Sequence, residues 1–238
     1  MKMDELRIIG YEWCDGRRLC DGRPIPGIGE WIEYEGGAEI GERGMHCSKH
    51  PLDALHWHPG SISSILRVEV TGALDTAGDP PTRYAGTEGR VLGSVDARPV
   101  LGAWKRWCAR RVLHLWPAPP IVQAFLTTGD ESLRCGAAAK ATAAWDTVEG
   151  FAARQAVKAA ECAAAEAATA RAAAGAFAAK AATYAAAQEA AAAGEYAAEG
   201  DAIAADAHCA EQAAQRAELR RLVEEAFAIQ AREGGPHS

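Results

Sequence analysis

Ala190-Ala191-Ala192-Ala193, together with Ala163-Ala164-Ala165 and Ala172-Ala173-Ala174, belongs to the stretch that decides the fold of the second half of the chain. From about residue 134 to residue 230, alanine dominates, and Glu, Gln, Lys and Arg are scattered among the alanines. Alanine loses no side-chain entropy in a helix, so this half is predicted to be helical. A methyl group buries little apolar area, so stability has to come from close approach of backbones over a large contact.

Glycines and the few large side chains divide this half into segments. The glycines Gly150, Gly175, Gly194 and Gly200 are predicted to break it into helices of moderate length. Large residues recur seven apart, as in Phe177 and Tyr184 or Tyr196 and Ile203, and a heptad-like stripe of Leu219, Leu222, Val223 and Phe227 lies near the end. We therefore expect an antiparallel helical array with small-residue seams, suited to protein contacts and self-association.

The first 72 residues indicate short strands separated by glycine turns. Residues 6–11 and 30–34 are predicted strands, and residues 62–70 alternate so that Leu66, Val68 and Val70 face one side while Arg67 and Glu69 face the other. Residues 51–57 suit one or two helical turns, with Pro51 at the first helical position and Ser48 near the cap. Loops around a short strand at 90–92 are expected over residues 72–99, which are rich in Gly, Pro and Thr.

A tryptophan-rich helix is predicted over residues 101–116. One apolar face is formed at three- or four-residue steps by Leu101, Trp104, Cys108, Val112 and Leu115, and Lys105, Arg106 and Arg110 are expected outside it. Pro117, Pro119 and Pro120 end this helix, and a short helix resumes over residues 121–126 until Gly129.

These patterns predict an α+β fold, in which a small N-terminal mixed α/β-sheet unit precedes an alanine-rich antiparallel helical array. The change of composition near residue 134 favours division of the 238 residues. We expect a small α+β domain over residues 1–100, tryptophan-rich connecting helices over 101–134 and an alanine-rich helical domain over 135–238.

The charge distribution argues against nucleic acid as a partner. The formal net charge is −7; residues 1–134 contain 16 Lys and Arg against 18 Asp and Glu, and residues 135–238 contain 9 against 14. Neither half has the cluster of Lys and Arg that phosphate binding needs. Since the sequence also shows no apolar run long enough for a membrane span and no signal peptide, we expect a cytoplasmic protein without a membrane partner.

Cysteine and histidine residues raise the question of a metal site. The seven cysteines are an odd number spread over both halves, which favours reduced thiols. The densest set of possible zinc ligands contains His46, Cys47 and His50, with Cys14 and Cys20 upstream. Five residues separate Cys14 from Cys20, instead of the two to four typical of a zinc site, and His56 and His58 are expected to face solvent. We therefore predict no metal and no cofactor, with His46 and Cys47 as buried turn residues.

Two segments resemble known families. Gly44-Met45-His46-Cys47-Ser48, the following Pro51-Leu52-Asp53-Ala54-Leu55 and a strand ending in Val68-Glu69-Val70-Thr71-Gly72 resemble an uncharacterised domain family of bacteriophage and actinobacterial genomes. This resemblance covers about residues 1–96 and implies no established activity.

The second resemblance lies further along the chain. Residues 107–113, then Gly129-Asp130-Glu131-Ser132-Leu133-Arg134 and the alanine-rich segments are similar to the alanine-rich helical domain of putative bacterial immunity proteins. The similarity covers about residues 103–184, and it implies binding to a protein without catalysis. The proline interruption and the added N-terminal unit depart from that family.

An enzymatic alternative centres on His46. His46-Cys47-Ser48 is similar to a strand element of the nicotinamide cleft in ADP-ribosyltransferase-like folds, which would give His46 and Ser48 a catalytic or nucleotide-binding role. Such enzymes need a second strand motif and a glutamate; Tyr34 and Glu69 are available, but nothing in their spacing singles them out. No phosphate-binding glycine loop and no nucleophile elbow is present in the sequence.

A second possible binding surface is formed by Trp104, Arg106, Trp107 and Arg110, which could stack on a base or bind an anion; the alternative for these aromatic residues is packing in a core. Without a credible catalytic set, the leading hypothesis is a non-enzymatic accessory protein of phage or prophage type. It would act by protein–protein interaction and self-association as a homo-oligomer. An ice-binding surface ranks last, because a regular Thr ladder is missing.

Overall fold

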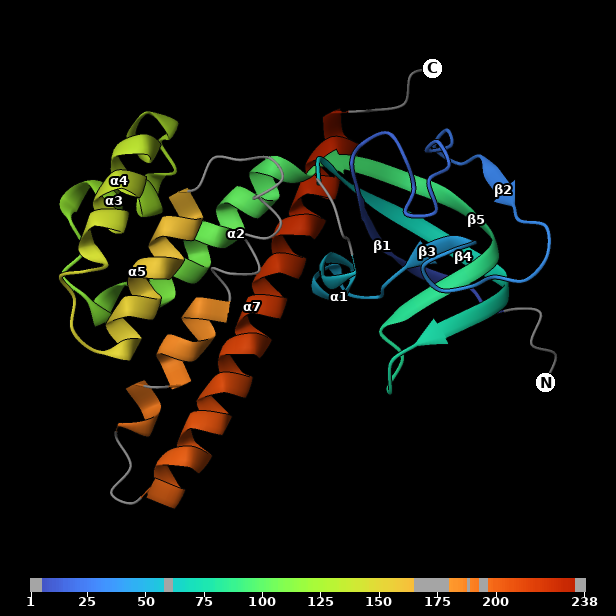
Figure 1. Ribbon diagram of the computed structural model, residues 1–238. Coiled ribbons are helices and arrows are strands. Elements are labelled where there is room, and N and C mark those ends of the chain that lie inside the picture. Colours follow the sequence, from blue (N-terminus) through green and yellow to red (C-terminus); the bar gives the residue numbers. More distant parts are fainter. Residues whose placement is uncertain (1–5, 58–61, 165–179, 188, 193–196, 234–238) are drawn as a thin grey trace. The chain divides into compact units, whose positions relative to one another are not determined.

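The computed structural model describes residues 6–57, 62–164, 180–187, 189–192 and 197–233 (Figure 1). The chain has the predicted α+β fold, with a five-stranded antiparallel sheet and several helices. It divides into two compact units. Unit 1 contains Met1–Val100 and Leu219–Ser238, and unit 2 contains Leu101–Glu218.

Unit 1 is built on the sheet. Its strands are β1 (Ile8–Cys14), β2 (Trp31–Glu33), β3 (Met45–Cys47), β4 (Ser64–Ala77) and β5 (Arg83–Asp96). The strand order is β1-β4-β5-β2, and β3 also pairs with β5, on the same edge as β2. All of these pairings are antiparallel.

The sheet curls until its two ends meet (Figure 1). Ser48, immediately after β3, forms an antiparallel bridge with Tyr11 of β1, in which each backbone N–H donates to the other residue's carbonyl at 2.8 and 3.0 Å. Gly10 allows this approach, because a Cβ on it would lie 2.7 Å from the Ser48 carbonyl oxygen and 2.9 Å from the Cys47 Cβ. The bridge leaves a seam between β1 and β3.

Alternation along the strands decides which side chains fill the inside of the curled sheet. As predicted, Leu66, Val68 and Val70 of β4 are fully buried on the inner face, with Arg67 and Glu69 on the outer face. The inner cluster consists of Ile8, Cys14, Leu19, Tyr34, Met45, Cys47, Leu66, Val68, Val70, Tyr84 and Val91.

The prediction of loops over residues 72–99 was wrong. β4 and β5 form a long hairpin, paired from Ser64 opposite Asp96 to Ala77 opposite Arg83. The glycines that suggested loops are places of close packing instead: a Cβ on Gly89 would lie 2.7 Å from the Met45 Cγ, and a Cβ on Gly93 would lie 3.3 Å from the Phe227 ring.

Helix α1 (Pro51–His56) occupies the predicted position, with Pro51 at its start. The N-cap is His50, whose Nδ1 accepts the Leu52 N–H at 3.1 Å, and Ser48, predicted near the cap, lies two residues before it. The Trp13 indole N–H donates to the Pro51 carbonyl at 2.7 Å, which ties α1 to β1.

The last turns of α7 (Ala197–Glu233) belong to unit 1, so the prediction of one domain over residues 135–238 was wrong. The stripe predicted near the end of the chain explains this, since Leu219, Val223 and Phe227 are buried. Glu224 from the same turns accepts hydrogen bonds from Tyr11 and Arg67 on the outer face of the sheet, and Gln230 Nε2 donates to the Ser94 carbonyl at 2.6 Å. Leu219–Ser238 therefore completes the sheet unit.

Unit 2 is helical, as predicted for this part of the chain. It contains most of α2 (Ala97–Arg111), then η2 (Leu113–Leu115), α3 (Pro120–Thr128), η3 (Glu131–Leu133), α4 (Arg134–Ala144), α5 (Phe151–Ala164), helical residues 180–187 and α7 as far as Glu218.

Small residues line the packed faces of unit 2. A Cβ on Gly136 of α4 would lie 2.5 Å from the Cδ1 of Ile121 in α3, so these helices approach closely. The buried alanines of α4 and α5 are Ala137, Ala141, Ala156, Ala159, Ala160, Ala163 and Ala164. Gly129 ends α3 in the left-handed conformation, with φ of 70°, as expected. Gly200, in contrast, lies inside α7 and does not break a helix.

Several predicted features lie outside the described residues: the run Ala172–Ala174, the breaks at Gly175 and Gly194, the large residues Phe177 and Tyr196, and His58. Within the described parts of the chain, no helix is long and apolar enough to cross a membrane.

Candidate functional site

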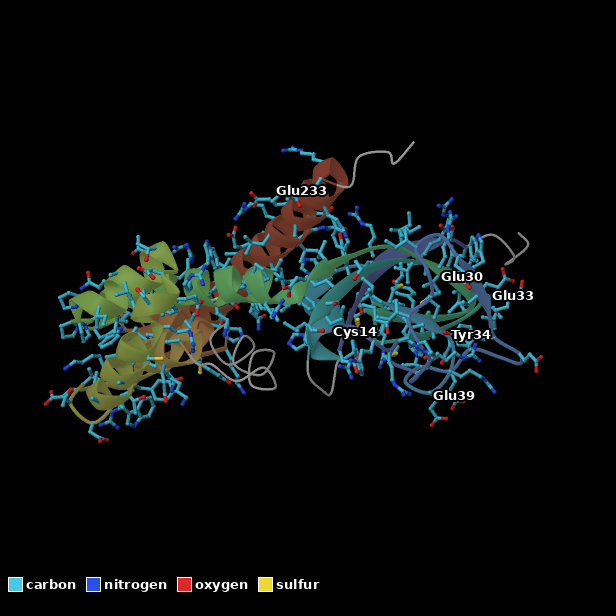
Figure 2. The ribbon with its side chains drawn as sticks, turned by 90° about the horizontal axis from the view of Figure 1, so that it is seen from above. Cys14, Glu30, Glu33, Tyr34, Glu39 and Glu233 are labelled. Atoms are coloured by element: carbon cyan, nitrogen blue, oxygen red, sulfur yellow. The ribbon has the colours of Figure 1, made fainter. Side chains whose placement is uncertain are left out.

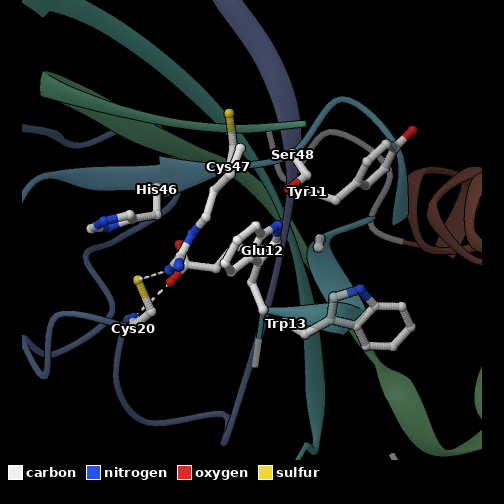
Figure 3. A pocket seen from close by; sticks show the side chains of 10 residues that line it. Tyr11, Glu12, Trp13, Cys20, His46, Cys47 and Ser48 are labelled. Carbon is white, nitrogen blue, oxygen red and sulfur yellow. Dashed lines mark hydrogen bonds between the residues drawn. The ribbon is translucent and has the colours of Figure 1, made fainter. Parts of the chain in front are cut away.

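The predicted residues His46 and Ser48 lie in unit 1 beside the seam between β1 and β3. Both are buried, at 3% and 1% exposure. They line a small cavity together with Cys20, with Glu12 of β1 and with Arg83 of β5 (Figure 3). The cavity has a volume of about 20 Å³, which is room for about one water molecule.

Glu12 is the unusual member of this seam cluster, which we define as Glu12, Cys20, His46 and Arg83. Its side chain is 5% exposed, and Oε1 accepts the Cys20 backbone N–H at 2.6 Å. Its other oxygen, Oε2, is buried without a hydrogen-bond partner among the described residues. Burial raises the pKa of Glu12 to about 7, although the Cys20 hydrogen bond and Arg83 act in the opposite direction.

His46 is neutral in this environment, because burial and then the nearby Arg83 lower its pKa. Its Nε2 accepts the Gly41 backbone N–H at 2.9 Å, which leaves the ring proton on Nδ1. Arg83 donates to the Cys20 sulfur at 3.6 Å, and its guanidinium lies 5.1 Å from the centre of the Trp57 ring.

The seam cluster does not supply an activated nucleophile. Burial, and then the carboxylate of Glu12, raise the pKa of the Cys20 thiol, and the same two causes raise the pKa of Cys47 to about 12. Both thiols therefore remain protonated near neutral pH, and a protonated thiol is a poor nucleophile. Within the described residues, no group of three or more His, Cys, Asp and Glu side chains is arranged to hold a metal ion.

The second predicted surface is divided between core and solvent in unit 2. Trp104 is fully buried and its indole N–H donates to the Gln215 carbonyl at 3.1 Å, so it is a core residue and not part of a binding surface. Arg106 is half-buried with its guanidinium 6.0 Å from the centre of the Phe125 ring, and burial lowers its pKa. Arg110 is exposed and donates to the Leu126 carbonyl at 3.1 Å.

Trp107, the fourth of these residues, is half-buried, with the Arg111 guanidinium 5.3 Å from its ring centre. Lys105, which was expected outside the helix face, is buried at 4% exposure. Of the two interpretations given for these aromatic residues, packing in a core thus applies to Trp104.

A more extended arrangement lies on the outer face of the sheet, where four residues stand in register across four strands. Ile9 of β1 is opposite Glu69 of β4, Glu69 is opposite Arg90 of β5, and Arg90 is opposite Trp31 of β2. We call Ile9, Glu69, Arg90 and Trp31 the outer row. Its two ends are exposed apolar side chains, since Ile9 is 50% and Trp31 is 45% exposed.

Charged contacts hold the centre of the outer row in place. Glu69 is buried beneath two arginines: Arg7 Nε lies 2.6 Å from its Oε1, and Arg90 Nη2 lies 2.9 Å from its Oε2. The Arg90 guanidinium also lies 4.9 Å from the centre of the Trp31 ring. The contacts thus orient Arg90 and the indole of Trp31 before any partner binds.

Sequence reasoning missed both the buried Glu12 and the outer row. Residues 8, 10, 12 and 14 alternate toward the inner face, so extending the predicted strand 6–11 by three residues would have placed Glu12 inside. The outer row needs the pairing register of four strands, which the sequence alone does not give.

Comparison of the chain with protein-family models, with curated proteins and with solved structures gave no match. The resemblances to a bacteriophage-type domain and to bacterial immunity proteins therefore stay predictions.

Proposed function

We propose that the chain is a non-enzymatic accessory protein that binds another protein through the outer face of its sheet. The observation that carries this proposal is the outer row, in which exposed Ile9 and Trp31 flank an Arg90 side chain already fixed by Glu69. Trp and Arg are the residues most enriched among those that dominate binding energy at protein interfaces. Side chains held in position before binding lose less entropy when the partner arrives.

The position of the last turns of α7 also supports binding through the outer face of the sheet. Its last turns cover the part of the outer face that contains Tyr11, Arg67 and Gly93, through Glu224 and Phe227. The outer row lies beyond this cover, with its end residues exposed, so these apolar side chains are available to a partner.

The seam cluster does not support the alternative of an ADP-ribosyltransferase-like or nucleotide-binding protein centred on His46. A cavity of about 20 Å³ does not accommodate a nicotinamide ring, and pockets for such ligands have volumes of about 300 Å³ or more. The proposal also includes a phage or prophage origin and a cytoplasmic location, and both rest on the sequence arguments given above.

A matched pair of tryptophan variants tests the proposal. Trp31 and Trp57 are similarly exposed, at 45% and 43%, and each lies under an arginine, at 4.9 and 5.1 Å respectively. The immobilised full chain is incubated with a bacterial lysate, and the captured proteins are compared among wild type, Trp31→Ala and Trp57→Ala. We expect a captured set that persists in Trp57→Ala and is lost in Trp31→Ala. Equal capture by both variants, or no specific capture, would refute binding through this face.

A further inference from the structure

A larger cavity than the one at the seam lies in unit 2, on helices α4 and α5 and the turn between them. The two helices lie side by side, as both Figure 1 and Figure 2 show. The cavity has a volume of about 380 Å³, which lies within the range of about 300–1,000 Å³ for pockets that bind small molecules. We call it the α4–α5 cavity, and its lining residues are Thr142, Trp145, Asp146, Gln155, Lys158 and Glu161.

Helix α5 supplies half of this lining. Gln155, Lys158 and Glu161 are spaced by three residues, so each side chain lies beside the next on the helix surface. Lys158 Nζ lies 2.8 Å from Glu161 Oε2, and the Thr142 hydroxyl of α4 donates to Glu161 Oε1 at 3.3 Å. The positive charge of Lys158 is thus paired within the lining, and both oxygens of Glu161 are engaged.

The turn after α4 supplies an aromatic ring and a carboxylate. Trp145 is 37% exposed, so part of its indole is accessible to a ligand. Asp146 is exposed, and its carboxylate has no hydrogen bond or ion pair within the part of the chain that the structure describes. Since Lys158 and Glu161 balance each other, the lining has one net negative charge, which is that of Asp146.

An unpaired carboxylate and an indole in one cavity favour a cation as the ligand. The face of a tryptophan ring attracts a cation within about 6 Å of the ring centre, and a carboxylate accepts its strongest hydrogen bonds from charged N–H donors. An anion would be repelled by Asp146, and a neutral molecule would gain less from both groups. A protonated amine is the ligand that uses the two groups together.

We propose that the α4–α5 cavity binds a small organic ammonium ion, which is a protonated primary amine on an apolar body. The ammonium group donates to the carboxylate of Asp146, and the indole of Trp145 contacts the cation and its apolar body. This inference goes beyond the proposed function, because it assigns a small-molecule site to unit 2, whereas the outer row lies in unit 1.

A matched pair of probes tests the inference by isothermal titration calorimetry of the full chain at neutral pH. Cyclohexylammonium and cyclohexanol have the same ring and nearly the same size, but only the first is charged. We expect cyclohexylammonium to bind with one-to-one stoichiometry, and the dissociation constant of cyclohexanol to be higher by roughly an order of magnitude or more. In a two-dimensional proton–nitrogen NMR spectrum, the same titration should shift the indole resonance of Trp145, which is identified by its loss in Trp145→Phe.

Asp146→Asn removes the unpaired charge with little change of shape. Because this side chain is exposed, the variant should fold like wild type in near-ultraviolet circular dichroism. Its dissociation constant for cyclohexylammonium should rise by roughly fivefold to tenfold, towards the value for cyclohexanol. The control is Glu149→Gln, at an exposed acid of the same turn that does not line the cavity, and it should leave both dissociation constants unchanged. Trp145→Ala should weaken the binding of both probes, and Trp57→Ala, in unit 1, should weaken neither.

Three results would overturn the inference. Equal dissociation constants for the two probes would show that the cavity recognises only the apolar ring. Unchanged binding of cyclohexylammonium by Asp146→Asn would show that the carboxylate does not hold the ammonium group. No heat of binding and no shift of the Trp145 resonance at millimolar cyclohexylammonium would show that the cavity is not a site for organic cations. The proposed function is tested separately, since Trp31 and the rest of the outer row do not line this cavity.

Discussion

Glu12 should make the stability of the sheet unit depend on pH. Burial raises its pKa from the ordinary value of 4.5 to about 7 in the folded chain. Each pKa unit corresponds to about 1.4 kcal/mol, so the difference between folded and unfolded states amounts to about 3.5 kcal/mol. The folded state favours the protonated carboxyl. The contribution of Glu12 to the free energy of unfolding is therefore higher by this amount below about pH 4.5, falls as the pH rises from 4.5 to 7, and is constant above.

The variant Glu12→Gln isolates this contribution, because the amide keeps the shape of the carboxyl and an oxygen to accept the Cys20 N–H but does not ionise. Urea denaturation of the full chain, followed by tryptophan fluorescence at several pH values, gives the unfolding free energy of variant and wild type. The variant should gain about 3.5 kcal/mol over wild type at pH 8 relative to pH 4. Glu35→Gln, at an exposed glutamate, is the control and should show no such gain. A difference between Glu12→Gln and wild type that stays constant from pH 4 to pH 8 would refute the reasoning.

Three further predictions concern packing, an ion pair and thiols. Gly89→Ala should lower the unfolding free energy by about 1–3 kcal/mol in urea denaturation, because the added Cβ would lie 2.7 Å from both the Met45 Cγ and the Glu69 carbonyl oxygen. The control is Gly37→Ala, whose Cβ would have no atom within 4 Å, and its unfolding free energy should stay within about 0.5 kcal/mol of wild type. Arg111→Ala removes two hydrogen bonds to the buried carboxylate of Glu211, at 2.9 and 3.1 Å, and should lower the unfolding free energy by about 1–3 kcal/mol. Arg221→Ala, which removes the exposed pair with Glu225, should lower it by less than about 0.5 kcal/mol. Equal losses of unfolding free energy in the two variants would contradict the role of burial. Of the seven thiols, the exposed Cys135 and Cys209 should react rapidly with Ellman's reagent in the native chain. Cys14, Cys47 and Cys108 should react slowly, because burial raises their pKa values. Rapid reaction of these three thiols would show that the core is open.

The sequence correctly predicted the elements that are determined by a pattern of a few neighbouring residues. The alternation of residues 62–70 correctly separated Leu66 and Val68 from Arg67 and Glu69, and Gly129 correctly marked the end of α3. In both cases one rule of spacing or backbone conformation decides the result, and no distant residue is needed.

Glycines misled the prediction where a distant residue decides their role. Gly86, Gly89 and Gly93 weaken the strand pattern of residues 83–96, and yet each lies where a neighbouring side chain packs closely on β5: Val70, Met45 and Phe227 respectively. A sequence read locally does not distinguish a glycine that turns the chain from one that makes room for a side chain 44 or 134 residues away.

The candidate sites show the same limit. His46 was identified from the sequence, but Glu12 joins it only through the Tyr11–Ser48 bridge that closes the sheet. The outer row needs three strand registers to be known at once. The stripe ending in Phe227 was recognised as an apolar face, but alanine-rich neighbours give no periodicity that would tell which surface it covers.

β1 and the last turns of α7 are far apart in the sequence but lie in one unit, and this arrangement has a consequence for biosynthesis. The hydrogen bond between Tyr11 and Glu224 joins residues 213 positions apart. A ribosome adds about 5–20 residues per second, so β1 emerges many seconds before the helical turns that cover it have been translated. During that interval Tyr11 and Arg67 of the nascent sheet lack the cover that these turns provide. This unit therefore reaches its native state only after the last turns of α7 have been translated, and a stop codon before residue 219 would leave it incomplete.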